Sequence, residues 1–200
     1  ALSTLRNALD HPHHAVRQAA ASALSTATDT PVTAAPRPLP ETPALDWSYL
    51  QEMGPHPRLT LETNRGRIVL ELDTEQAPQT VQAITRFARE GRYEGVPFHR
   101  VVPNFVVQGG DFARRTGFGG PGFFLRTEIT RLGHRRGTLG MASAGKDTEG
   151  SQFFVPHSVQ PHLDGSYTSF GTVVEGMEVV DQLRVNDRIT KAHVEPTRNP

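Results

Sequence analysis

Short runs that alternate apolar and polar residues occupy much of the chain beyond residue 57, and such alternation is typical of half-buried β-strands. The first two, RLTLET at 58–63 and RIVLEL at 67–72, are separated by Asn64, Arg65 and Gly66, which is a hairpin signature. Later strand-like runs lie at 97–101, 105–108, 138–142, 152–155, 168–174 and 188–194. The pattern therefore predicts many short strands.

Only two segments of this region have helical spacing. Residues 78–90 carry a proline in the first turn and present an apolar face made of Val81, Ile84, Phe87 and Ala88. Residues 176–184 are the second predicted helix, whose inward residues are Val179, Val180 and Leu183. Because strands and helices do not alternate regularly, the pattern favours an antiparallel barrel over a parallel sheet. We expect a mainly β main domain at 58–195, followed by a short tail at 196–200.

The N-terminal part has a different pattern. Apolar residues between Leu2 and Leu24 recur at helical spacing with an interruption at 10–12, so residues 1–28 are predicted to form a small α-helical hairpin. The string DHPHHAVRQAAASAL at 10–24 resembles the second half of a HEAT repeat. The alternative is an amphipathic hairpin of no particular family. A lone repeat cannot bury its own apolar face, so the hairpin is expected to pack on the main domain or to end a longer solenoid.

Residues 29–57 form the predicted connection between these parts. Prolines recur between Pro31 and Pro43 among Thr and Ala, a composition that favours an extended, semi-rigid linker. Within it, 46–53 is expected to form a short helix, with Trp47 and Leu50 as apolar anchors.

Composition narrows the function classes. The 200 residues have a net charge of zero and 36% hydrophobic content, enough for one packed domain plus a smaller part. The sequence has no long basic run of the kind that binds nucleic acid. The short cluster of His134, Arg135 and Arg136 is interpreted as a solvated face. The absence of cysteine excludes disulfides and thiolate chemistry. No apolar run is long enough for membrane insertion. Since the chain begins at Ala1 within a helical pattern, we expect a soluble fragment whose compartment, cytoplasm or periplasm, stays open.

Three segments carry the candidate chemistry. FHRVVPNFVVQGGDF at 98–112 places one cation, Arg100, among apolar side chains and adds an amide donor, Gln108. A rigid guanidinium beside an apolar surface can grip an uncharged carbonyl substrate. GMASAG at 140–145 and GSQFFV at 150–155 complete the pattern. In this order, the three segments closely resemble the cyclophilin family of peptidyl-prolyl cis/trans isomerases.

The resemblance runs from about Leu59 to about Val194, and HLDGSYTSFG at 162–171 is similar to bacterial members. It implies a closed eight-stranded antiparallel barrel, capped by two helices, with an active groove on its outer surface. It also implies that Arg100 is the catalytic cation and that Val102 and His162 lie at the pocket edge. The substrate-binding residues that it implies are Phe105, Val106, Gln108, Ala142, Ser143, Ala144, Gln152, Phe154, Leu163 and Tyr167. Strand alternation separates Phe153 from Phe154, and Phe154 is the one expected to face the groove.

The activity implied by the resemblance is isomerisation of X-Pro bonds in peptides and unfolded proteins, assisting folding without cofactor, metal ion or covalent intermediate. One alternative is a scaffold module that binds proline segments with little turnover, and another makes the helical hairpin the functional part. His162 stands where drug-sensitive members carry Trp, which implies weak cyclosporin binding. Self-association through the hairpin or the linker is a further hypothesis, in which a linker proline occupies a groove: Pro36, Pro38 or Pro40.

Three other patterns are similar to known sites only superficially. GFGGPG at 117–122 has the spacing of a dinucleotide loop, but Pro121 and the lack of a following helix favour a surface loop. Ser143 lacks the preceding glycine of a serine elbow, so a hydrolase is not expected. The closely spaced histidines near the N-terminus are not followed by a set at ligand spacing, so no metal site is expected at His11, His13 and His14.

Overall fold

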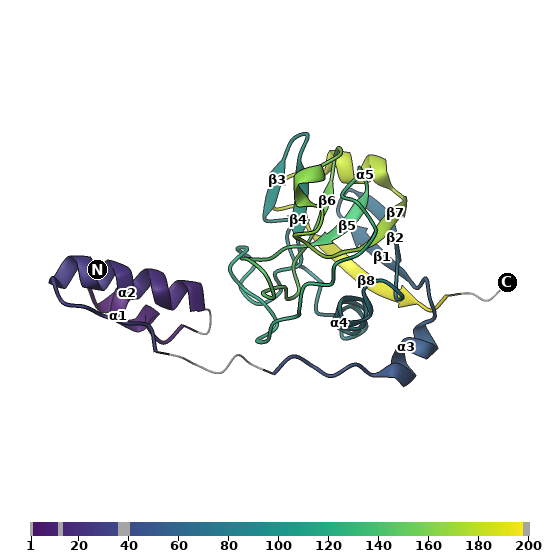
Figure 1. The fold of residues 1–200 in the computed structure, drawn as a ribbon. Coiled ribbons are helices and arrows are strands. Elements are labelled where there is room, and N and C mark those ends of the chain that lie inside the picture. The colour runs from purple at the N-terminus through teal and green to yellow at the C-terminus, as the bar shows by residue number, and fades with distance from the viewer. Residues whose placement is uncertain (1, 12–13, 36–40, 198–200) are drawn as a thin grey trace. The chain divides into compact units, whose positions relative to one another are not determined.

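The computed structural model describes residues 2–11, 14–35 and 41–197, which belong to two compact units, Ala1–Pro40 and Glu41–Pro200 (Figure 1). Several residues on which predictions fell lie outside the described ones, namely His13, Pro36, Pro38, Pro40 and the last three residues of the tail. Within the described ranges, no helix combines the length and the apolar character needed to cross a membrane.

The first unit is the predicted helical hairpin, made of α1 (Leu2–Ala8) and α2 (His14–Thr28). Its buried apolar side chains come from α2 and are Ala20, Ala21 and Leu24. Arg17 of α2 is only 2% exposed, and its Nη1 donates to the His11 carbonyl at 2.8 Å, which ties the helix to the preceding turn. The likeness to a HEAT repeat stays a prediction.

The second unit is a curled sheet of eight antiparallel strands in the order β3-β4-β6-β5-β7-β2-β1-β8. The strands are β1 (Arg58–Thr63), β2 (Gly66–Leu72), β3 (Arg100–Val102), β4 (Val106–Gly109), β5 (Thr138–Met141), β6 (Phe153–Pro156), β7 (Ser169–Glu175) and β8 (Ile189–Glu195). Apart from β3, their bounds agree with the predicted runs to within about one residue, since the period of two is set by burial of alternate side chains. The predicted eight-stranded antiparallel fold is confirmed.

The segment before β3 meets the start of β8, so that the two edges of the curled sheet are brought together there. An isolated antiparallel bridge joins Pro97 to Arg188, and the N–H of Ile189 donates to the Val96 carbonyl at 3.0 Å. The run predicted as one strand at 97–101 is therefore divided, and that prediction is wrong: its first residue pairs across the closure, and β3 begins three residues later. Proline has no N–H with which to extend a ladder, so Pro97 does not lengthen β3.

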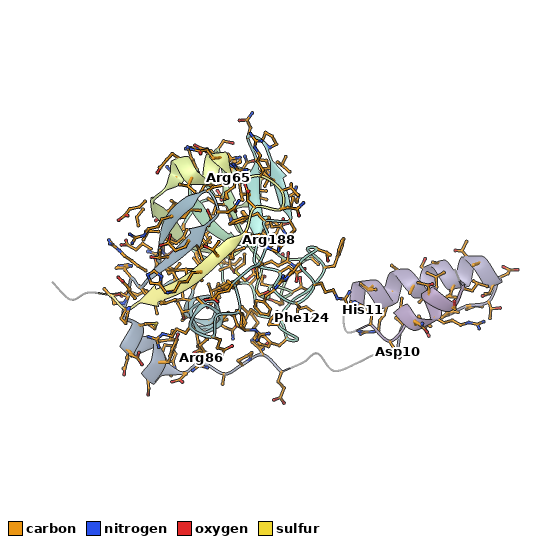
Figure 2. The ribbon with its side chains drawn as sticks, turned by 180° about the vertical axis from the view of Figure 1, so that it is seen from behind. Asp10, His11, Arg65, Arg86, Phe124 and Arg188 are labelled. Carbon is orange, nitrogen blue, oxygen red and sulfur yellow. The ribbon has the colours of Figure 1, made fainter. Side chains whose placement is uncertain are left out.

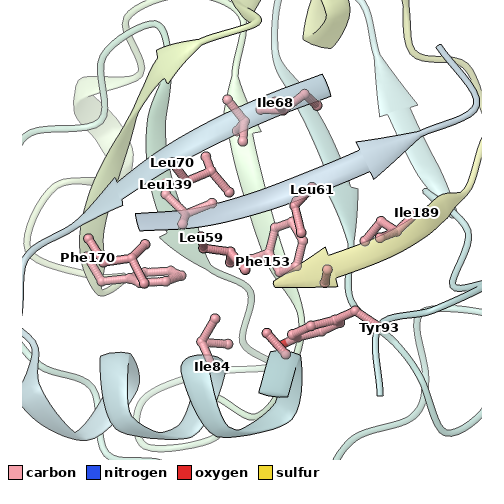
Figure 3. Packing of buried hydrophobic residues seen from close by; sticks show 14 of the residues in the cluster. Leu59, Leu61, Ile68, Leu70, Ile84, Tyr93, Leu139, Phe153, Phe170 and Ile189 are labelled. Carbon is pink, nitrogen blue, oxygen red and sulfur yellow. The ribbon is translucent and has the colours of Figure 1, made fainter. Parts of the chain in front are cut away.

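Helices α4 (Pro78–Arg89) and α5 (Met177–Gln182) lie at opposite ends of the barrel (Figure 1). Their predicted inward residues are all buried: Val81, Ile84, Phe87, Ala88, Val179, Val180 and Leu183. Ile84 and Tyr93 close the core below strands β1 and β2, beside Phe153 and Phe170 (Figure 3). Burial of this continuous apolar cluster is the main stabilising contribution to the barrel.

Residues 41–57, predicted as part of one linker, belong to the barrel unit in the structure. The predicted short helix is α3 (Trp47–Met53), and the Asp46 carboxylate caps it by accepting the Tyr49 N–H at 3.0 Å. Leu50 is buried as predicted, but Trp47 is 63% exposed, so its prediction as an anchor is wrong and Met53 is the second buried side chain. Asp46 also pairs with Arg86 of α4, which is labelled in Figure 2. The Gln82 side chain accepts from the Asp46 N–H, so this segment is bound along α4.

Candidate active site

Three neighbouring strands, β3, β4 and β6, place the predicted site residues on one face of the sheet. Arg100 lies opposite Gln108, and Gln108 lies opposite Phe154. Val102 and Val106 form the next opposed pair. Directly opposed residues point to the same side of a sheet, and successive residues alternate. The intervening side chains therefore face the barrel core, and these are Val101, Val107, Phe153 and Val155.

The outward side chains form an apolar cluster separate from the barrel core. This outer cluster consists of buried Val106, Phe154 and Leu163 with partly buried Phe105, Ala142 and Tyr167. Leu163 ends the short 3-10 helix η1 (Pro161–Leu163). Tyr167 meets the Phe154 ring edge-on, with 6.0 Å between centroids. At the border of the cluster, His162 stacks on the Phe105 ring at 5.9 Å.

The Phe154 ring is held by two residues that sequence reasoning did not assign to the site. The His134 ring stacks on it at a centroid distance of 5.5 Å and an angle of 19°. Gly140 lies opposite Phe154 in β5, where a Cβ would come within 2.5 Å of the Phe154 Cζ. The absence of a side chain at Gly140 therefore leaves room for the ring. The available signal was a glycine inside a strand pattern, which often marks close approach.

His134 is only 1% exposed, so the interpretation of 134–136 as a solvated face is wrong for this residue. Its Nδ1 lies 2.9 Å from Asp164 Oδ1, and its Nε2 lies 3.2 Å from the Ser169 hydroxyl. Burial lowers the pKa of His134, although the Asp164 carboxylate acts in the opposite direction. A neutral ring donating from Nδ1 and accepting at Nε2 satisfies both partners. The sequence showed two cations directly after His134 but not the packing that buries its ring against Phe154.

Beside the outer cluster, hydrogen bonds between side chains lead from Arg100 to the loop at 117–122. Arg100 Nη1 donates to Gln108 Oε1 at 3.4 Å, and Gln108 Nε2 donates to Gln152 Oε1 at 3.2 Å. Gln152 Nε2 donates in turn to two carbonyls of the loop, at 3.0 and 2.8 Å. The guanidinium carbon of Arg100 is 5.4 Å from the centroid of Phe105. Arg100 is exposed, so a guanidinium with five donors stands at the border of the apolar cluster.

The loop itself is organised by a buried carboxylate. Asp111 is fully buried and accepts four backbone N–H groups, from Arg114, Thr116, Gly117 and Gly119. Burial alone raises the pKa of Asp111, but these four bonds outweigh it and hold the pKa below its usual value. The loop presents Phe118, which is 84% exposed. Its N–H groups at Gly117 and Gly119 are thus bonded to the protein's own carboxylate.

The remaining predicted residues lie at the end of β5. The Ala142 N–H donates to the Gln152 carbonyl at 2.9 Å, and the Ala144 N–H donates to Thr148 Oγ1 at 2.9 Å. Ser143, between them, is partly buried, and its side chain makes no hydrogen bond within the described residues. The structure thus brings Ala142 into the outer cluster, while Ser143 and Ala144 continue the edge beyond it.

Glu149 anchors the segment that connects β5 to β6. It is fully buried, and its carboxylate accepts the Thr168 N–H at 3.0 Å and the Thr168 hydroxyl at 2.7 Å. Burial, assisted by the charges of Glu128 and Asp147, raises the pKa of Glu149 to about 7. These acids do not form a metal site: among the residues that the structure describes, no group of three His, Asp or Glu side chains is placed to hold a metal ion.

Fold and site together define a class of protein, an antiparallel β-barrel whose outer face carries an apolar seat beside a cation and a pair of amides. The family model described as cyclophilin type peptidyl-prolyl cis-trans isomerase/CLD matches residues 58–199. The chain belongs to this family.

Relatives agree with this assignment. The chain is 46% identical over 136 residues to a peptidyl-prolyl cis-trans isomerase of Synechococcus elongatus, covering 67% of this chain and 93% of the relative. It is 47% identical over 131 residues to peptidyl-prolyl cis-trans isomerase B of Bacillus subtilis, covering 64% and 91%. The crystal structure of a Cryptosporidium parvum cyclophilin type isomerase superposes with a TM-score of 0.64 at 31% identity, covering 72% of this chain and 99% of that one. The predicted family is confirmed.

Proposed function

We propose that this chain catalyses cis/trans isomerisation of X-Pro bonds in peptides and unfolded proteins, with Arg100 as its electrostatic catalyst. Membership of the cyclophilin family and the names of the relatives support the activity. The observation that carries the assignment of Arg100 is its position. It is an exposed guanidinium on the same sheet face as Phe154, directly beside the outer cluster.

Peptide conjugation sets the barrier that the enzyme must lower, about 18 to 20 kcal/mol. As the X-Pro bond twists, the lone pair localises on the prolyl nitrogen, which becomes a better hydrogen-bond acceptor. A guanidinium held beside that nitrogen stabilises the twisted state more than the planar one, and only such differential binding accelerates the reaction. Gln108 and the ring of Phe105 hold Arg100 in place for this role. The step requires no nucleophile and no net proton transfer.

The outer cluster supplies the seat for the proline ring. Phe105, Phe154 and Leu163 offer apolar surface from three separate segments, and His134 fixes the angle of the Phe154 ring from behind. Holding the ring while the preceding residue rotates separates the moving part of the substrate from the fixed part. Gln108 and Gln152, with the edge at 142–144, are placed to bind the flanking peptide groups.

Exchange spectroscopy on a short X-Pro peptide tests this function, because it reports binding and interconversion together. Wild type is expected to accelerate exchange. Arg100→Ala is expected to lower kcat by about 10² to 10³, the loss typical for removal of one preorganised donor. Peptide binding is expected to survive, since the outer cluster is unchanged in this variant.

Two further variants serve as controls. Arg100→Lys keeps the charge but lacks the rigid planar fork, so it is expected to recover little of the rate. Arg67→Ala removes another exposed arginine, one paired loosely with Glu62 at 3.9 Å, and should leave the rate unchanged. Activity of Arg100→Ala within a few fold of wild type would show that Arg100 is not the catalyst. Binding by the wild type without acceleration would instead identify a proline-binding scaffold.

A further inference from the structure

A second concave surface lies at the end of the barrel that α5 covers. It is a groove of about 470 Å³ lined by residues of the β3–β4 turn and of the C-terminal end of α5, and none of its lining residues belongs to the outer cluster. Val101 of β3 lines it, whereas its neighbours Arg100 and Val102 face the other way because successive residues of a strand alternate. Its volume is within the range of ordinary ligand sites. We name it the α5 groove.

Part of the lining of the α5 groove is apolar. Leu183 and Val185, just beyond α5, line it together with Val101 and Pro103. Val185 is 52% exposed, so its side chain offers apolar surface to a ligand in the groove. The apolar residues of the lining can therefore accept an apolar side chain of a ligand, and this contact removes apolar surface of the groove and of the ligand from water.

The polar residues of the lining carry an excess of positive charge. Arg136 binds Asp181 through two hydrogen bonds, at 2.8 and 2.6 Å, so that this carboxylate is already compensated. Arg184 also lines the groove and is exposed, and no described residue pairs with its guanidinium. The Nε2 atom of His157, another lining residue, is buried without a hydrogen-bond partner among the residues that the structure describes. The α5 groove thus combines apolar lining residues with a cation, Arg184, that no carboxylate of the lining compensates.

We propose that the α5 groove binds an acidic peptide segment of a partner protein, in which an apolar side chain stands next to carboxylates. The apolar side chain packs on the exposed residues Pro103 and Val185, and a neighbouring carboxylate pairs with Arg184. Charge complementarity selects this occupant, because a basic segment would be repelled by Arg184 and a neutral one would gain no ion pair. Binding requires no proline and does not depend on turnover at Arg100.

The β3–β4 turn provides a way to detect occupancy. Pro103 and Asn104 line the α5 groove, and the next residue, Phe105, belongs to the outer cluster. The Asn104 carbonyl accepts from the Ser158 hydroxyl at 2.6 Å, and the Phe105 carbonyl accepts from the His157 N–H at 2.8 Å. Backbone amides around this turn therefore report a ligand in the groove.

The test is a titration of the full chain, labelled with nitrogen-15, with the blocked peptide Glu-Leu-Glu-Leu-Glu. This probe contains no proline. Saturable shifts are expected at the amides of Asn104, His157 and 183–185, and they should weaken as salt is raised because exposed ion pairs are screened. The same peptide with Lys in place of Glu is expected not to bind.

Matched variants separate the contribution of the apolar contact from that of the ion pair. Val185→Asn removes the apolar contact without adding a charge and should weaken binding about tenfold, the effect of burying one such side chain. Arg184→Glu should weaken it about fivefold, the upper end for an exposed ion pair. Arg126→Glu makes the same charge change at another exposed arginine and should have no effect. Arg100→Ala should bind the probe like wild type, and Val185→Asn should isomerise an X-Pro peptide like wild type.

Three results would overturn the proposal. One is the absence of saturable shifts at these amides. Another is equal binding of the lysine peptide, which would indicate apolar adhesion without charge selection. The third is binding that neither Val185→Asn nor Arg184→Glu weakens, which would place the peptide elsewhere on the chain.

Discussion

At the scale of single residues, Glu149 makes stability depend on pH. Its pKa rises from 4.5 to about 7 in the folded chain, chiefly through burial, so between these values the folded state holds more protons than the unfolded one. Stability therefore falls as pH rises through this window and is level above it. The ionised carboxyl costs on the order of 3 kcal/mol by the usual conversion.

Replacing this carboxyl by an amide tests the prediction. Glu149→Gln imitates the protonated form, so its free energy of unfolding should lack the decline that wild type shows between about pH 4.5 and about pH 7. Denaturant unfolding at several pH values measures it. Glu75→Gln changes an exposed carboxyl and should leave the wild-type profile intact. Identical slopes for Glu149→Gln and wild type would contradict the assignment.

A second residue-scale prediction concerns Asp111. Asp111→Ala leaves four backbone N–H groups of the loop without their acceptor, so it should lower the free energy of unfolding by about 3 kcal/mol. It should also weaken substrate binding, because Gln152 bonds to the same loop. Urea unfolding and peptide titration measure the two effects. Glu75→Ala is the matched control, and a loss no larger than in this control would show that the loop does not need Asp111.

The residues of the site differ in how far the sequence could reveal them. Arg100 and Phe154 could be predicted to share a face because strand alternation acts on neighbours in the chain. His134 and Gly140 act on the Phe154 ring across strands and loops, and no local pattern records such a contact. Glu149 and Asp111 likewise depend on partners that only tertiary packing provides.

At the scale of elements, α3 illustrates a segment held by side chains rather than by a ladder. The Tyr49 ring lies under the guanidinium groups of Arg86 and Arg89, at 4.7 and 5.2 Å, and its hydroxyl lies 3.0 Å from Thr85 Oγ1. Tyr49→Ala should release α3 from α4, so its amides should exchange with solvent much faster while barrel amides stay protected. Tyr49→Phe keeps the ring and should retain most of the protection. Unchanged exchange in Tyr49→Ala would mean that the other contacts suffice.

The elements also show where sequence patterns lose information. The period of two located seven strands closely, but β3 was misplaced because alternation does not tell which partner a residue pairs with. Proline content predicted an extended connection at 29–57, yet part of it packs on α4 through Gln82 and Asp46. Composition describes what a free segment would prefer, and tertiary contacts can override it.

At the scale of the whole molecule, every predicted site residue lies in the unit Glu41–Pro200. A chain limited to residues 41–200 should therefore isomerise an X-Pro peptide with the same kcat/KM as the full chain. Light scattering on both chains tests the hypothesis of self-association. A larger mass for the full chain alone would support a role of the N-terminal unit, and two monomers would refute it. A marked loss of activity in the shorter chain would contradict the first expectation.

Alternation along β3, β4 and β6 has a practical consequence. Because Val102 faces outward at the border of the seat while Val101 and Val107 face the core, a protein engineer can randomise position 102 in a library without disturbing the interior. The same separation gives natural variation a route to new client preferences, since selection can retune recognition at this position while the barrel keeps its interior.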